Sequence, residues 1–242
     1  MLRLALIIIT GFLMISPANA QPPKNAVLAY RNGVTLRDKA MYPEAIQSFK
    51  KAALLYKKYD SAYLQMGEIC LKQNKADTAV LYYNKALEIN PQQVLAYIAL
   101  GGIYRNIKAE FDKAISYYSS ALKIDNRNKE TLCNIAWCYN SQKQYDSAIM
   151  YAAKALDLDN DYKAGYGELG HAVHASKKYA EGLEQFRKNM SLSANPLPVL
   201  YSGLIYIELK DKENALKMYE RLEKTDSTMA GRLKKQIENA KY

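Results

Sequence analysis

The sequence predicts an all-α protein, a solenoid of about six stacked helical pairs followed by one capping helix. Two observations predict this fold class. Small residues recur at intervals of 33 to 35 positions, at Gly33, Gly67, Gly101, Ala136, Gly170 and Gly203. A second series runs in phase with the first, at Ala45, Ala79, Ala114, Ala148, Gly182 and Ala215. A fixed period of this length indicates stacked supersecondary units, and a chain of 242 residues, 49% of them hydrophobic, is long enough to bury a continuous core.

Each period reads as helix, turn and helix. In the second unit, apolar residues three and four positions apart within 61–72 mark one face of a helix that contains Gly67. Polar residues 74–77 break this pattern, and a second amphipathic stretch runs from Ala79 until Pro91 stops it. We interpret Gly67 and Ala79 as the positions where the two helices of the pair approach most closely.

The third unit carries the fullest version of a motif that the other units share in part. It reads Tyr97-x-x-Leu100-Gly101-x-x-Tyr104, then Ala114-x-x-x-Tyr118 and Ala121. This pattern resembles the tetratricopeptide repeat. The resemblance covers about residues 26–229 and implies a right-handed α-solenoid that binds proteins or peptides and is not an enzyme. The later units depart from the motif at Gly182, Asn189 and Ser202.

The phased series divide the chain into units. Residues 21–25 form a short lead, and Met229, Leu233 and Ile237, four positions apart, predict a capping helix within 229–242. The one additional residue of the third unit is expected in the turn between its helices, around 107–111. The predicted units are 26–59, 60–93, 94–128, 129–162, 163–195 and 196–228.

Residues 1–20 have a different character from the repeats. Arg3 precedes an apolar stretch from Leu4 to Ile15, and small residues follow at 18–20. This order is typical of a secretory signal that is cleaved after Ala20, and a retained membrane anchor is the alternative. We therefore expect an exported, bacterial-type protein, periplasmic or secreted, with no stable membrane span after cleavage. A lipid anchor is not expected, because the first cysteine is Cys70.

The formal charge of +10 at pH 7 raises the hypothesis of a polyanion-binding protein. The lysines of the chain are interspersed with acids along the second helices, as on a solvated face, so a nucleic-acid partner is not favoured. The three cysteines predict no disulfide. Cys133 and Cys138 lie on one predicted helix and point about 140° apart, and Cys70 belongs to a distant unit. We favour the interpretation that all three cysteines are small apolar residues in helix packing.

No motif for a catalytic site or a cofactor is present in the sequence. Phosphate-binding glycine loops, GxSxG, CxxC and HExxH patterns are all missing. His171 and His174, three positions apart on one predicted helix, raise the alternative hypothesis of a metal site with Glu168 as a third ligand. The interpretation of these histidines as polar residues that line a groove is favoured over it.

The resemblance implies that the first helix of each pair lines a concave groove, where we expect the partner to bind. Trp137 allows two interpretations, a groove residue beside His171 or a core residue. The lysine, asparagine and arginine clamp by which some relatives hold terminal carboxylates is not reproduced. The candidate partner-binding residues are Tyr30, Arg37, Leu64, Glu68, Arg105, Trp137, Asn140, His171, His174 and Leu204.

Overall fold

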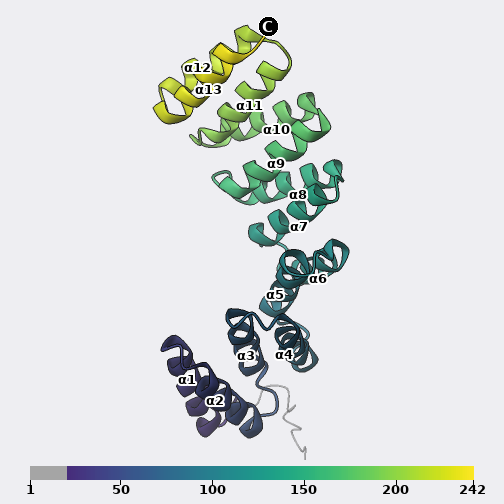
Figure 1. Cartoon of the computed structure of the whole chain (residues 1–242), viewed down its shortest axis with the longest axis vertical. Coiled ribbons are helices and arrows are strands. Elements are labelled where there is room, and N and C mark those ends of the chain that lie inside the picture. Colours follow the sequence, from purple (N-terminus) through teal and green to yellow (C-terminus); the bar gives the residue numbers. More distant parts are fainter. Residues whose placement is uncertain (1–20) are drawn as a thin grey trace, which may run out of the picture.

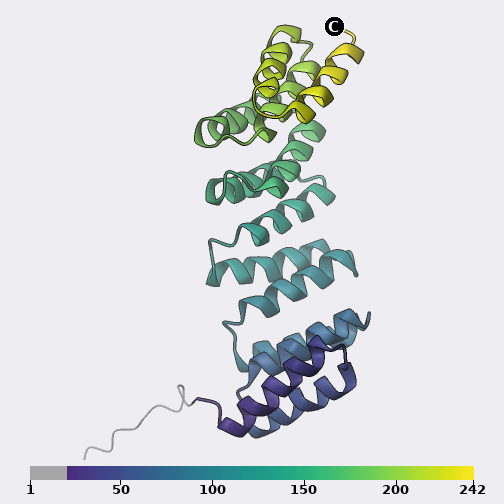
Figure 2. The same cartoon turned by 90° about the vertical axis from the view of Figure 1, so that its left-hand side faces the viewer.

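The computed structural model describes residues 21–242 as an elongated stack of helices, with the chain rising from one end of the stack to the other (Figure 1). Viewed from the side, successive helices lie across the long axis one above the next (Figure 2). The all-α solenoid is confirmed, since the described residues form thirteen α-helices. The predicted signal segment, residues 1–20, lies outside the described residues.

The helices form six sequential pairs and one additional helix. The first helices of the pairs are α1 (Lys24–Asp38), α3 (Asp60–Lys72), α5 (Val94–Asn106), α7 (Lys129–Ser141), α9 (Lys163–Ser176) and α11 (Leu197–Glu208). The second helices are α2 (Tyr42–Leu55), α4 (Ala76–Ile89), α6 (Phe111–Ile124), α8 (Tyr145–Leu158), α10 (Tyr179–Leu192) and α12 (Lys212–Glu223). The additional helix, α13 (Ser227–Asn239), packs Leu233 and Ile237 against the sixth pair. No helix within residues 21–242 has the length and hydrophobicity that crossing a bilayer requires.

The turn inside each pair repeats one backbone conformation. The turn of the third unit, between Asn106 and Phe111, contains the additional residue that the sequence placed there. In each turn one residue that is not glycine has a positive φ between 53° and 60°, although this region favours glycine or asparagine. In the first unit, the N–H of Met41 closes the turn by donating to the carbonyl of Leu36 at 2.9 Å. The positive-φ residues are Ala40, Asn74, Ala109, Lys143, Lys177 and Lys210.

The glycines of the first three units each lie under an aromatic ring of their own second helix. A Cβ atom placed on Gly101 would lie 2.6 Å from the Tyr118 ring, and one on Gly67 would lie 2.7 Å from the Tyr83 ring. The equivalent pair in the first unit is Gly33 and Phe49. The neighbour that excludes a side chain is therefore a ring, and not the backbone of the second helix as the sequence suggested.

This packing changes in the fifth unit. A Cβ on Gly170 would lie 2.4 Å from the ring of Tyr201, which comes from the next unit, α11. Phe186, at the aromatic position of α10, stacks on Tyr201 with ring centroids 5.6 Å apart. The glycine of α9 is thus covered by a ring from α11, where the first three units use a ring from the same pair.

The same shift recurs in the sixth unit, where Leu233 of α13 covers Gly203 at 2.5 Å. The three cysteines are buried and unbonded to one another, as predicted. Burial raises the pKa of Cys133 to about 12 and that of Cys138 to about 11. Both thiols are therefore protonated and unreactive at neutral pH.

Candidate partner-binding groove

Two cavities adjoin on the face formed by the first helices of the last three units. They share Gly167 and His171 in their walls, and we refer to them together as the C-terminal groove. The α7–α9 cavity, about 530 Å³, is lined by Trp137, Asn140, Ser141, Lys143, Tyr145, Gly167, Glu168 and His171. The α9–α11 cavity, about 510 Å³, is lined by Gly167, Gly170, His171, His174, Phe186, Tyr201, Leu204, Ile205, Ile207, Glu208 and Gln236. Both volumes fall within the range of about 300–1,000 Å³ that is typical of ligand sites.

Polar contacts link the first helices of successive units at equivalent positions. The first residue of each contact lies four positions after the recurring small residue of its unit, as Arg37 does after Gly33. Its partner lies two positions before the small residue of the next unit, as Gln65 does before Gly67. The pairs are Arg37 with Gln65, Arg105 with Asn134, and Asn140 with Glu168. At the last junction the equivalent residue is Tyr201, which covers Gly170 instead. The junction between α3 and α5 has the apolar residues Leu71 and Ala99 at these positions. The polar contacts therefore join the first unit to the second, and the third, fourth and fifth units to one another.

Trp137 lies on the surface of the α7–α9 cavity, together with His171. Its side chain is 37% exposed and meets the Phe111 ring edge-on at a centroid distance of 5.8 Å. The Arg105 guanidinium carbon lies 5.1 Å from the centroid of the Trp137 ring, within cation–π distance. These surroundings fit the interpretation of Trp137 as a groove residue and not as a core residue.

Asn140 lies in the wall of the same cavity and carries a buried hydrogen-bond acceptor. The residue is 7% exposed, and its Nδ2 donates to the carboxylate of Glu168 at 2.8 Å and to the Glu168 carbonyl at 3.1 Å. Because Nδ2 is held by two acceptors, the amide orientation is fixed. The Oδ1 atom is buried and has no partner, and an unpaired buried acceptor costs about 1–3 kcal/mol.

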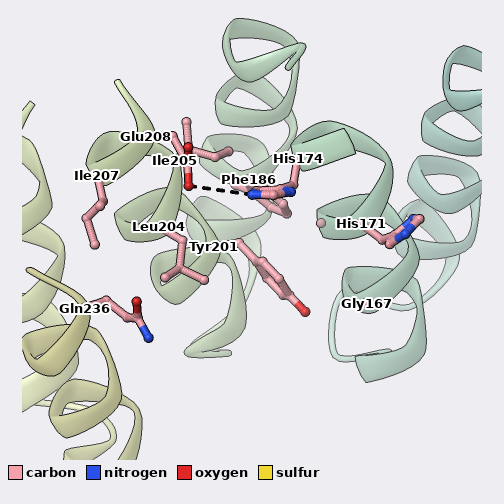
Figure 3. A pocket seen from close by; sticks show the side chains of 11 residues that line it. Gly167, His171, His174, Phe186, Tyr201, Leu204, Ile205, Ile207, Glu208 and Gln236 are labelled. Carbon is pink, nitrogen blue, oxygen red and sulfur yellow. Dashed lines mark ion pairs between the residues drawn. The ribbon is translucent and has the colours of Figure 1, made fainter. Parts of the chain in front are cut away.

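The two histidines point to different neighbours. His174 Nε2 lies 3.6 Å from Glu208 Oε1 across the α9–α11 cavity, while His171 points away from it (Figure 3). The His171 ring meets the Tyr145 ring at a centroid distance of 6.4 Å. No group of three or more potential ligands within residues 21–242 lies close enough to hold a metal ion. The metal hypothesis requires both rings to face one ion, and the two rings point in different directions.

The remaining predicted site residues divide between the groove and other environments. Leu204 lines the α9–α11 cavity. Arg37 and Glu68 form an ion pair of 3.7 Å at the N-terminal end of the first-helix face. Tyr30, also at that end, stacks on the Tyr59 ring at 4.9 Å.

The structure corrects one predicted groove residue, Leu64. Its side chain is 5% exposed and belongs to the core between the second and third units, with Cys70 and Leu100. It is therefore not accessible to a partner.

Several residues of the α9–α11 cavity were not predicted from the sequence as site residues. Tyr201, Phe186 and Glu208 line this cavity, as does Gln236 of α13. The sequence does show that the sixth unit departs from the motif at Ser202, but it does not show that the neighbouring tyrosine covers the glycine of the preceding unit.

Four family models described as tetratricopeptide repeat match the chain, at residues 61–93, 96–130, 129–162 and 199–227. Together they cover more than half of it. Among curated proteins, the chain is 30% identical over 87 residues to anaphase-promoting complex subunit 3 of Schizosaccharomyces pombe. That match covers 36% of this chain and 13% of the relative, so the chain spans only a small part of it. The photosystem I assembly protein Ycf3 of Rippkaea orientalis is 29% identical over 132 residues, 48% of this chain and 76% of the relative.

Solved structures share the fold along most of the chain. A tetratricopeptide repeat protein from Parabacteroides merdae is 16% identical with a TM-score of 0.60, covering 91% of this chain and 94% of that one. YrrB, titled a TPR protein with an unusual peptide-binding site, is 22% identical with a TM-score of 0.57 over 77% and 97% of the two chains. At these identities the likeness concerns the fold alone.

Proposed function

Because the chain belongs to the tetratricopeptide repeat family, we propose that it is a non-catalytic binding protein that holds an extended peptide segment or another protein in the C-terminal groove. Repeat proteins of this type offer long continuous surfaces to their partners. The observation that carries the proposal is the continuity of the two cavities through Gly167 and His171. Two adjoining cavities on one face fit a long ligand better than a compact one.

The chemistry of the groove supports this proposal. Trp137 presents an exposed aromatic surface that is held in place by Arg105 and Phe111. A rigid aromatic side chain loses little entropy on binding, and tryptophan and arginine are enriched among the residues that dominate binding energy. The names of two similar proteins, an assembly protein and a peptide-binding repeat protein, fit a role of this kind.

Truncating the tryptophan tests the groove. We expect Trp137→Ala to weaken partner capture about thirtyfold, since loss of a central aromatic residue costs about 2 kcal/mol. The measurement is crosslinking of purified variants in the native extract, with quantitative mass spectrometry of the captured partner. Leu54→Ala is the matched control, because Leu54 is 79% exposed on α2, outside the groove. Equal capture by Trp137→Ala and Leu54→Ala would argue against the groove.

We also propose that the protein acts outside the cytoplasm, on the basis of the signal-like order of residues 1–20. The expected mature chain begins at Gln21. Intact-mass measurement of the protein purified from its native host tests this, and a chain that retains Leu4–Ile15 would contradict cleavage.

A further inference from the structure

We propose that the α9–α11 cavity takes one aromatic side chain of the bound segment. This inference rests on the proposed function and specifies the partner's chemistry. It starts from a feature that the fold does not otherwise require, the cavity between the fifth and sixth units.

The cavity is a consequence of the altered packing at this junction. Tyr201 covers Gly170 from α11, and Phe186 stacks behind it. Both rings therefore line a space between the first helices of two units (Figure 3). The other walls are aliphatic, formed by Leu204, Ile205 and Ile207. The cavity thus offers ring surfaces and aliphatic side chains to whatever enters.

The lining selects an uncharged occupant. No lysine or arginine belongs to the described residues that line this cavity, so an anion has no charged partner there. Its one carboxylate, Glu208, is 48% exposed and lies 3.6 Å from the exposed His174 side chain, so it stands at the solvent edge of the cavity and not among the apolar walls. Phe186 is fully buried behind Tyr201, so the ring surface open to an occupant is that of Tyr201. A ring prefers an aromatic partner, which gains about 0.5–1.5 kcal/mol beyond the area it buries. An aromatic side chain therefore fits this lining best.

The passage between the two cavities favours an extended segment over a small aromatic molecule. Gly167 forms part of both walls, and a Cβ atom placed on it would meet nothing within 4 Å. A chain can therefore cross this glycine from one cavity to the other.

The experiment uses a phage-displayed library of random peptides, about a dozen residues long, as the probe. We expect the full protein to select peptides that share one aromatic residue. Binding of a synthetic selected peptide is then followed through Trp137, the single tryptophan, which lies in the α7–α9 cavity. A peptide without tryptophan keeps this signal specific to the protein.

Gly167→Leu is the blocking variant. Its side chain enters the passage without displacing a neighbour, and leucine favours a helix over glycine by roughly 1 kcal/mol, so the variant folds. We expect it to weaken peptide binding at least tenfold. Gly231→Leu is the matched control, because Gly231 is also a helical glycine with open space around it but lies on α13 outside both cavities. It should bind as the wild type does.

Each result bears on a different claim. If the library yields no binding peptide, the claim that the groove holds an extended segment fails, and the aromatic pocket fails with it. If it yields peptides that lack an aromatic residue, or that bind Gly167→Leu as tightly as Gly231→Leu, the aromatic pocket is wrong and the proposed function stands.

Discussion

Raising the pH from 7 to 11 is expected to remove most of the free energy of unfolding, and two buried thiols contribute a large share of that loss. Burial raises the pKa of Cys133 from 9.0 to about 12 and that of Cys138 from 9.0 to about 11. The side chains are 6% and 0% exposed, respectively. Ionisation of either thiol in the folded state places a charge among apolar neighbours.

The direction follows from proton binding in the two states. In the unfolded chain each thiol loses its proton near pH 9, while the folded protein keeps both protons until about pH 11 or 12. Between these limits the unfolded state binds fewer protons, so stability falls as the pH rises. At pH 11 the loss of stability amounts to about 2–3 kcal/mol for each thiol. A domain of this kind has only about 5–15 kcal/mol of stability.

Tyrosines add to the loss. Burial raises the pKa of Tyr118 and of Tyr166 from 10.0 to about 12, which adds about 1 kcal/mol each at pH 11. Urea unfolding followed by circular dichroism at intervals from pH 7 to 11 measures the profile. The double variant Cys133→Ala/Cys138→Ala should lose about 5 kcal/mol less than the wild type over this range. Parallel profiles for the two proteins would show that the thiols do not carry the effect.

The sequence predicts the scaffold well because the scaffold repeats. The small residues recur at a nearly constant interval, and those of the first three units meet a ring at the same position of their own second helix, so the period alone locates the helices and the turn with one additional residue. The turn conformation was not predicted, because the sequence marks a positive φ by glycine or asparagine and only Asn74 fits that rule. Ala40 and Lys143 adopt the same φ through the closure of the turn.

The groove was predicted in part, for a physical reason. A first-helix position that faces the groove in one unit can be buried in another, because the bulk of the neighbouring residues differs between units. Leu64 is buried while Trp137 at a nearby position of the fourth unit is exposed. The α9–α11 cavity depends on which of two rings, Phe186 or Tyr201, covers Gly170. Residue types alone do not decide between two rings that are both within reach.

The packing of a ring over a glycine gives the second large effect. Tyr118→Ala is expected to cost about 3–5 kcal/mol, because the ring is 1% exposed and its loss leaves a cavity. Gly101→Leu alone should cost about 1–3 kcal/mol, because a Cβ there lies 2.6 Å from the ring and forces it to move. Urea unfolding of the two single variants at pH 7 measures both costs.

The double variant Gly101→Leu/Tyr118→Ala separates complementarity from simple loss of apolar surface. The leucine can occupy the space that the ring vacates, so the combined cost should be smaller than the sum of the single costs by about 0.5–3 kcal/mol. Purely additive costs would contradict a shared site. The fourth unit has the small residues Ala136 and Ala152 at the equivalent positions, both 0% exposed. The fourth unit thus packs a small residue at the ring position against alanine in place of glycine, so in the third unit each single change should be tolerated poorly without the other.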